Sequence, residues 1–152
     1  MRTLLAVCIA VWTLLGVFLL LDISKEFAFA DIHKLEDSIV DATNKVRAEH
    51  GLPSLVKDTM LTENAKRYAI VNADKGFISH NHEPLTSRMP SSCISIGENL
   101  YQGRDGSGEG IVNAWMRSPA HRENILDAEW ERIGVGVARI GSQIVAVQLF
   151  CR

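Results

Sequence analysis

The 152-residue sequence has no marked excess of charge of either sign. It contains 16 Lys and Arg residues against 18 Asp and Glu residues, which gives a net charge of −2. These charges are well mixed along the chain, and the sequence lacks a basic stripe of the kind that binds a phosphate backbone. We therefore expect no nucleic-acid partner. No internal repeat is visible, and the length fits a single domain.

Common nucleotide-binding and catalytic motifs are also missing. The glycine-rich segment 103–110 lacks the Gly-Lys-Ser/Thr ending of a phosphate loop and does not match G-x-G-x-x-G. The metalloprotease motif H-E-x-x-H is absent, and Ser107 does not lie in a G-x-S-x-G nucleophile elbow. These absences count against the commonest hydrolases and leave the sequence without an evident nucleophile.

One long apolar run is present, at the N-terminus. Residues 3–21 (TLLAVCIAVWTLLGVFLLL) carry no charge, and about 20 such residues span a bilayer core as a helix. The run also lacks the polar face of a buried soluble helix. We therefore predict a hydrophobic helix that acts as a membrane anchor or signal segment at 1–21, a linker at 22–30 and a folded domain at 31–152.

The apolar run has two interpretations. A signal peptide has an apolar region of about 7–15 residues followed by small residues at the cleavage site, and Ala28-Phe29-Ala30 would allow cleavage before Asp31. Because the run is long and Ala30 lies nine residues beyond it, we favour an uncleaved anchor over secretion after cleavage near Ala30. Arg2 favours a cytoplasmic N-terminus, so both interpretations place the domain outside the cytoplasm.

Cysteine is scarce, with three residues in the whole chain. Cys8 lies inside the apolar run, which leaves Cys93 and Cys151 in the folded part. An even count in an oxidising location favours a disulfide between these two. The alternative is two separate buried thiols that pack as small apolar groups.

The hydrophobic periodicity predicts helices first and a β-hairpin last. Cap and turn residues set the expected bounds. They give helices over 31–50 and 58–76, a loop over 77–92, a strand over 97–102, short helices beginning near Ser107 and Ser118-Pro119, and two strands joined at Gly141-Ser142. This order indicates an α+β fold and not a parallel βαβ sheet.

Four polar residues of the folded part are candidates for chemistry: His80, His82, Glu98 and His121. Imidazoles with one carboxylate suit a divalent metal such as zinc, with water in the open position, and they equally suit an acid–base pair. Sequence spacing does not distinguish a metal site from an acid–base pair, because the candidates lie far apart in the chain. His80 and Glu98 are 18 residues apart, and Glu98 and His121 are 23 residues apart. Solvated loop histidines are the alternative.

A series of short motifs spans roughly residues 32–151. In order, these are Asn44-x-x-Arg47-x-x-x-Gly51-Leu52, Ser79-His80, Gly97-Glu98-Asn99-Leu100, Ala114-Trp115, Ser118-Pro119-Ala120-His121-Arg122-Glu123-Asn124-Ile125-Leu126 and Gly134-Val135-Gly136-Val137. The ordered set resembles the prokaryotic branch of the CAP superfamily, the cysteine-rich secretory, antigen 5 and pathogenesis-related proteins, whose domain is also called SCP. The resemblance implies an α-β-α sandwich with a cleft across a central antiparallel sheet.

The same resemblance implies a site. By motif position, His80, Glu98 and His121 would face the cleft, where some members bind a divalent metal, often zinc. His82 has no counterpart in the motif, so we expect it to be solvated. Relatives often supply a second glutamate one turn beyond the tryptophan, but Trp115 is followed by Met-Arg-Ser. We therefore expect any metal to be held weakly, with water completing the ligand set.

The other motif residues have structural interpretations. We expect Asn99 and Asn124 to satisfy turn or backbone groups, and Trp115 to lie in the core. Arg47 and Arg122 are expected to pair with carboxylates.

Function is less constrained than fold. Members of the resembled family bind sterols, lipids, receptors or cell-wall material, and a few have been proposed as proteases. We favour a ligand-binding module, with a lipid, a cell-wall component or a protein as ligand, because no activated nucleophile is visible and the second glutamate is missing. The alternatives are a metal-assisted hydrolase with Glu98 as base, and an envelope protein without turnover.

Overall fold

The computed structural model describes residues 30–104 and 106–152. The chain divides into two compact units, residues 1–33 and 34–152, and the second unit carries the fold described below. The predicted anchor at 1–21, all but the last residue of the linker at 22–30, and Cys8 lie outside the described residues. Within the described ranges, no helix is both long enough and apolar enough to cross a bilayer.

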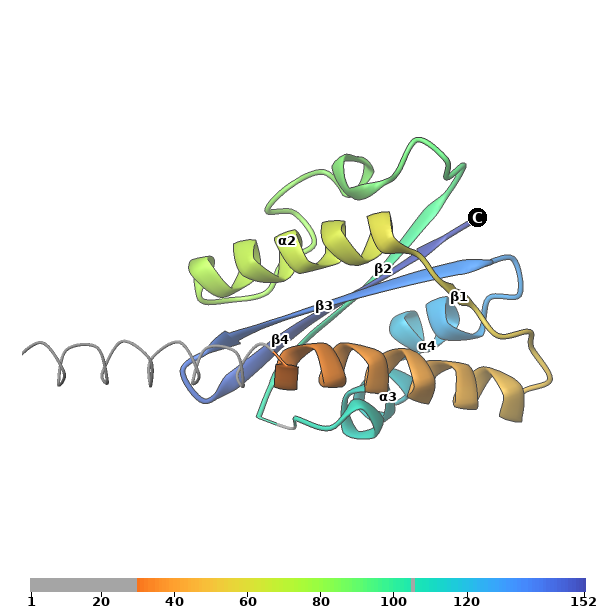
Figure 1. Cartoon of the computed structure of the whole chain (residues 1–152), viewed down its shortest axis with the longest axis horizontal. Coiled ribbons are helices and arrows are strands. Elements are labelled where there is room, and N and C mark those ends of the chain that lie inside the picture. The colour runs from red at the N-terminus through yellow and green to blue at the C-terminus, as the bar shows by residue number, and fades with distance from the viewer. Residues whose placement is uncertain (1–29, 105) are drawn as a thin grey trace, which may run out of the picture. The chain divides into compact units, whose positions relative to one another are not determined.

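The described elements follow the predicted order (Figure 1). A helix covers residues 30–49. It is followed by β1 (Val56–Lys57), α2 (Thr59–Lys75), the 3-10 helix η1 (Leu85–Arg88), β2 (Ile96–Gly103), α3 (Gly108–Met116), α4 (Pro119–Leu126), β3 (Arg132–Ile140) and β4 (Gln143–Cys151). The two short elements, β1 and η1, were not among the sequence predictions.

The strands form one sheet in the order β1-β3-β4-β2. β4 pairs antiparallel with β2 and with β3, so that Ile96 and Arg132 both lie opposite Cys151. The predicted α+β fold with a central antiparallel sheet is confirmed, and β1 adds a two-residue parallel edge beside β3. β2 forms the opposite edge, where elements from both helical layers can reach it.

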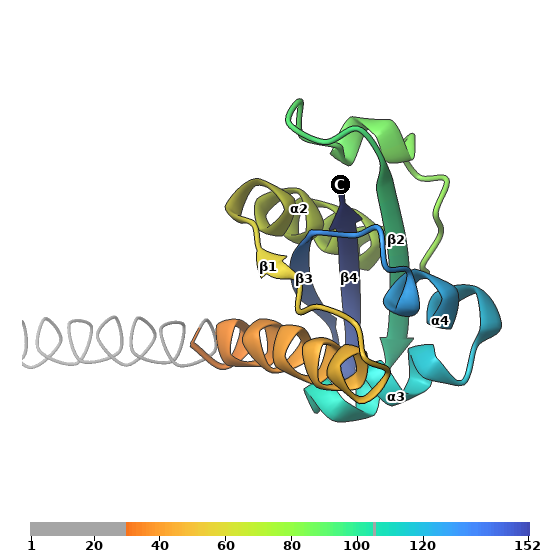
Figure 2. The same cartoon turned by 90° about the vertical axis from the view of Figure 1, so that its right-hand side faces the viewer.

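Helices cover both faces of the sheet. α2 lies on one face, and residues 34–49 with α3 and α4 lie on the other (Figures 1 and 2). The glycines of β3 explain why α2 packs so closely. A Cβ at Gly134 would lie 2.3 Å from the backbone of Leu61, and one at Gly136 would lie 2.1 Å from the backbone nitrogen of Lys66. Side chains at these two positions would push α2 off the sheet.

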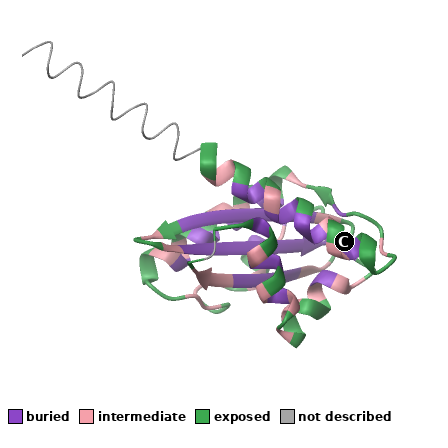
Figure 3. Ribbon diagram, turned by 90° about the horizontal axis from the view of Figure 1, so that it is seen from below, coloured by how far each residue is buried: buried purple, intermediate pink, exposed green. Residues whose placement is uncertain are grey.

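The core consists of the strands and the inner faces of the helices (Figure 3). Val145, Val147 and Leu149 of β4 pack in one cluster with Leu61 and Tyr68 of α2. On the other layer Trp115 is 1% exposed, and its indole Nε1 donates a 2.9 Å hydrogen bond to the carbonyl of Leu100. The predicted core role of Trp115 is therefore confirmed, with its one polar atom satisfied.

The predicted helix boundaries hold where cap residues set them. The Asp58 carboxylate accepts a hydrogen bond from the backbone N–H of Leu61, and Gly76 ends α2 with a φ of 78°. Ser107 caps α3 through Gly110. Ser118 occupies the cap position of α4 but makes no side-chain capping hydrogen bond, so Pro119 alone marks the start of that helix.

A disulfide joins Cys93 to Cys151, whose Cα atoms lie 5.7 Å apart. The predicted pairing is confirmed, and the alternative of two separate thiols is excluded. The bond connects the segment that leads into β2 with the last residue of β4. It therefore closes the end of the sheet from which β2 begins.

Candidate functional site

The site begins with a contact between a loop histidine and a strand carboxylate. His80 lies in the loop that follows α2, and its Nδ1 lies 2.7 Å from Oε1 of Glu98 on β2. The side chain of His80 is 54% exposed, whereas that of Glu98 is only 1% exposed. Glu98 is therefore a buried support, and His80 is the group that solvent or a ligand can reach.

His121 approaches the same place from α4, on the other helical layer. Its ring centroid lies 6.5 Å from that of His80, at an interplanar angle of 40°. Partial burial lowers the pKa of His121, and the neighbouring His80 lowers it further. Both effects favour the neutral ring of His121. The structure thus places all three predicted site residues together at the β2 edge, with one direct contact between His80 and Glu98.

A fourth residue, Arg88, completes the site and was not predicted. Its guanidinium is fully buried, with Nε 3.0 Å from Oε2 of Glu98 and Nη2 3.3 Å from Oε1. Both carboxylate oxygens of Glu98 therefore lie within ion-pair distance of Arg88, although Oε2 and Nε do not form a hydrogen bond with each other. The guanidinium also lies 3.5 Å from the ring centroid of Tyr68, a cation–π contact that is favourable when desolvated.

Arg88 also binds the loop that carries His80. Its Nη2 donates to the carbonyl of His80 at 3.3 Å, and its Nη1 donates to the carbonyl of Glu83 at 3.0 Å. No sequence pattern revealed this role, because a single arginine in a polar loop between two prolines is ordinarily a solvated residue. The 3-10 helix η1 turns Arg88 inward, and Asn64 of α2 donates to its carbonyl.

The start of the same loop is fixed by α2. The hydroxyl of Tyr68 donates a 2.7 Å hydrogen bond to the carbonyl of Ser79, and the backbone N–H of Ser79 donates to Oδ1 of Asn72 at 2.8 Å. Tyr68 and Asn72 are both fully buried. His80 therefore follows directly after a residue that is held at both its N–H and its carbonyl.

A buried amide network holds the backbone of the site. Nδ2 of Asn124 donates to the carbonyl of Glu98 at 3.0 Å, and Nδ2 of Asn99 donates to the carbonyl of His121 at 3.1 Å. Asn99 also donates to Oε1 of Gln148. The predicted backbone-satisfying roles of Asn99 and Asn124 are confirmed, and each holds a residue of the candidate site.

The remaining motif residues lie outside the site. Arg47 is fully buried but donates to the backbone carbonyls of Pro53, Ile125 and Asp127, so the expected pairing with a carboxylate was wrong. Burial lowers the pKa of Arg47, and Asp127 opposes that change. His82 is half-buried: its Nε2 lies 3.1 Å from the carbonyl of Phe77, and its ring packs edge-on against that residue.

A metal held by His80, Glu98 and His121 does not fit this arrangement. Glu98 already has Arg88 on one oxygen and both Arg88 and His80 on the other, and Nδ1 of His80 is used in that contact. Within residues 30–104 and 106–152, no group of three or more His, Cys, Asp or Glu side chains is arranged to hold a metal ion. The predicted weak binding of zinc by His80, His121 and Glu98, with water completing the ligand set, therefore finds no support in this geometry.

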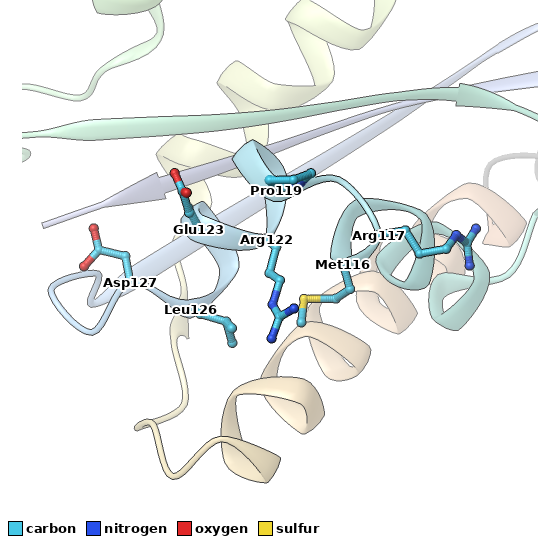
Figure 4. Close-up of a pocket in the computed structure, with 7 residues that line it drawn as sticks. All are labelled: Met116, Arg117, Pro119, Arg122, Glu123, Leu126 and Asp127. Carbon is cyan, nitrogen blue, oxygen red and sulfur yellow. The ribbon is translucent and has the colours of Figure 1, made fainter.

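A hollow of about 600 Å³ lies elsewhere, between the end of α3 and the outer face of α4 (Figure 4). The predicted site residues do not line it. Its lining combines two arginines and two carboxylates with three apolar side chains: Met116, Arg117, Pro119, Arg122, Glu123, Leu126 and Asp127. The opposite face of α4 carries Asn124 and Ile125 toward the sheet.

Comparison with protein families gives one match over most of the domain. The sequence profile described as the cysteine-rich secretory protein family, abbreviated CAP, matches residues 40–150. That range includes His80, Arg88, Glu98 and His121, and it contains every strand of the sheet apart from the last residue of β4.

Individual relatives come from bacteria. The chain is 34% identical over 119 residues to the uncharacterized protein YkwD of Bacillus subtilis strain 168, covering 74% of this chain and 46% of that protein. It is 31% identical over 111 residues to the uncharacterized membrane protein YlbC of the same organism, covering 68% of this chain and 32% of YlbC. The chain thus spans less than half the length of these two relatives.

The fold is also shared with a solved bacterial structure. An extracellular protein containing an SCP domain, from Bacillus anthracis str. Ames, superposes with a TM-score of 0.71 at 26% sequence identity. The match covers 79% of this chain and 41% of the other.

Proposed function

The chain belongs to the cysteine-rich secretory protein (CAP) family, and we propose that its domain is a ligand-binding module that works outside the cytoplasm through His80 and His121. The observation that carries the proposal is the contact between His80 and Glu98. A fully buried carboxylate holds Nδ1 of a half-exposed imidazole, so the ring is fixed in orientation before any ligand arrives.

The chemistry of the site suits hydrogen bonding. With Nδ1 donating to Glu98, neutral His80 presents Nε2 as an acceptor, and this tautomer is assigned from the hydrogen-bond geometry. His121, whose neutral form is favoured by burial and by the neighbouring His80, adds a second imidazole 6.5 Å away between ring centroids. The pair would receive a polar group that donates hydrogen bonds, such as a hydroxyl or amide of a sugar, peptide or lipid headgroup.

Turnover is less well supported by this geometry. Glu98 is occupied by Arg88, so it is not placed to remove a proton from water or to hold a metal. No Ser or Cys side chain is hydrogen-bonded to His80 or His121 in the described ranges. A hydrolase would need a base that is free to accept a proton next to the reacting atom.

The proposal also assigns a role to the apolar run near the N-terminus, as a membrane anchor. Residues 3–21 would hold the domain at the outer face of a membrane, in keeping with the relatives described as extracellular and as a membrane protein. Full-length protein should then remain in the membrane pellet after a carbonate wash, with an N-terminal sequence at or near Met1. A soluble species that starts at Asp31 would show secretion after cleavage instead.

The binding function is tested by NMR on the domain from Asp31 onward. Soluble peptidoglycan fragments and, separately, phosphatidylglycerol vesicles are added while the histidine ring resonances are followed. We expect one probe to shift His80 and His121 and to leave exposed His50 unchanged. Replacing His80 and His121 together with Ala should abolish binding of that probe, followed in the variant by the backbone amide resonances around the site, whereas His50→Ala should not.

Three results would count against the proposal. Shifts confined to other histidines, or the absence of any shift with both probes, would show that His80 and His121 do not form the ligand-binding site. Release of cleaved fragments during the titration would show turnover and favour the hydrolase. The double variant should keep the wild-type circular dichroism spectrum, because His80 is exposed and His121 is only half-buried.

A further inference from the structure

We propose that Arg88 is the positioning residue of this site, an internal cation that occupies the place beside Glu98 which a metal ion would need. The proposal deepens the binding function proposed above by naming what organises the site. It makes Glu98 a structural anion and not a ligand for metal. Its test uses zinc and no organic ligand, so that either proposal can fail alone.

The first step of the argument is the burial of the ion pair. Arg88 and Glu98 have side chains that are 0% and 1% exposed, and the Nε to Oε2 distance is 3.0 Å. A carboxylate in such a position needs a compensating charge, because an unpaired buried anion is strongly unfavourable. Arg88 supplies that charge permanently, since a guanidinium stays protonated in proteins.

The second step is the number of contacts that Arg88 makes. Its guanidinium contacts both oxygens of Glu98, the carbonyls of His80 and Glu83, and the ring face of Tyr68. These groups come from α2, the loop after it and β2. One planar group thus joins the three segments that define the position of His80, a task that a compact ammonium group would do less well.

The third step is the competition with a metal. A zinc ion bound through Glu98 would have to lie about 2.0–2.2 Å from a carboxylate oxygen. Oε2 faces Arg88, while Oε1 contacts both Arg88 and Nδ1 of His80. A dication there would be brought against a buried guanidinium of the same sign. Glu98 therefore cannot act as a zinc ligand while Arg88 is in place.

The direct test follows the side-chain carboxylate carbon of Glu98 by ¹³C NMR while zinc alone is added to the wild-type domain. If zinc moves the rings of His80 and His121, we expect the Glu98 resonance to move only by the small amount that its hydrogen bond to Nδ1 of His80 transmits. A shift as large as that of a carboxylate bound directly to zinc, saturating together with the ring shifts, would overturn the proposal.

Variants provide the second test, with zinc affinity measured by calorimetry. Glu98→Gln alone does not separate a ligand from a support, because losing either lowers zinc affinity about 10–100-fold. Arg88→Met should free Glu98 and tighten zinc binding at least about tenfold. Adding Glu98→Gln to Arg88→Met should remove that gain. An Arg88→Met variant that binds zinc no better than wild type would contradict the proposal.

A matched control separates positioning from general loop tethering. Arg67 of α2 also pairs with the same loop, through the carboxylate of Glu83 at 2.6 Å, but it does not contact Glu98. Arg67→Gln should therefore leave the zinc affinity and the His80 ring signals unchanged. If the Arg88→Met variant does not fold, the Glu98 carboxylate resonance of the wild-type domain still shows whether Glu98 binds zinc, and so still tests the proposal.

Discussion

Nδ2 of Asn124 on α4 donates a 2.9 Å hydrogen bond to Oδ1 of Asn99 on β2. The two residues are 25 positions apart, and between them they hold the carbonyls of Glu98 and His121. Asn99 also contacts Gln148, which donates to Oγ1 of Thr43. The backbone under the site is therefore fixed by one buried chain of amides that runs from the edge strand to the first helix.

Replacing Asn99 with Ala should destabilise the domain by about 1–3 kcal/mol, because the carbonyl of His121 and Oε1 of Gln148 both lose the donor Nδ2 of Asn99. Urea unfolding measures the change. The matched control is Asn113→Ala on the exposed face of α3, for which we expect a change within about 0.5 kcal/mol. Equal effects of the two substitutions would contradict a specific role for the network.

The cap of α2 predicts a dependence of stability on pH. Burial opposes ionisation of Asp58, but hydrogen bonds from Leu61 and Arg132 outweigh it and lower the pKa of the carboxyl. Because the folded-state pKa is the lower one, the stabilisation is present above the ordinary pKa of Asp and is lost as pH falls through the folded-state value.

Asp58→Ala should therefore cost about 1 kcal/mol at pH 7. Asp58→Asn should keep the helix cap but lose the ion pair with Arg132. The free energy of unfolding of this variant should depend less on pH below 5 than that of the wild type, a comparison made by urea unfolding at several pH values. An unchanged pH profile would show that Asp58 does not carry this charge effect.

His121 should titrate below the ordinary histidine pKa of 6.5, with burial as the larger cause and His80 as the smaller. The stability that comes from keeping the ring neutral is present above pH 6.5 and is lost as pH falls from there to the folded-state value. An NMR titration of the ring protons checks this, with exposed His50 as internal reference. In the His80→Gln variant, the pKa of His121 should rise only part of the way back to 6.5. A full return to 6.5 would contradict burial as the main cause of the shift.

The disulfide should contribute about 4 kcal/mol as an upper figure, from the chain entropy of a closed loop with a sequence separation of 58. The Cys93→Ser/Cys151→Ser variant should unfold at correspondingly lower urea. Its amide hydrogens in β2 should exchange faster, because the bond lies just before that strand. Thiol counting on the denatured, unreduced domain should find none. Two titratable thiols would show that the bond does not form.

The fold could be predicted from local signals. Asp58 and Gly76 mark the ends of α2 through residue types that suit those backbone positions, and the hairpin turn at Gly141 adopts a φ of 55°. β1 escaped prediction because Val56 and Lys57 are two exposed residues without periodicity, and only their parallel pairing with β3 defines a strand. Short elements of this kind depend on tertiary partners.

The candidate site was predictable only in part. His80, Glu98 and His121 were found from motif positions, but Arg88 was not, because its role depends on contacts made after folding. Its carboxylate partner lies ten residues along the chain, and its aromatic partner, Tyr68, belongs to the preceding helix. The sequence alone therefore suggested three metal ligands, where the structure has an ion pair that supports one exposed imidazole.

The central claim is that buried Glu98, held by Arg88, fixes the His80 ring so that Nε2 faces a ligand. A long-range ¹H–¹⁵N correlation spectrum of the His80 ring, recorded where the ring is neutral, tests it most directly. We predict a single tautomer with the proton on Nδ1 in the wild-type domain, and mixed tautomers in Glu98→Gln. A wild-type ring with its proton on Nε2 would contradict the account, because Nδ1 could not then donate to Glu98.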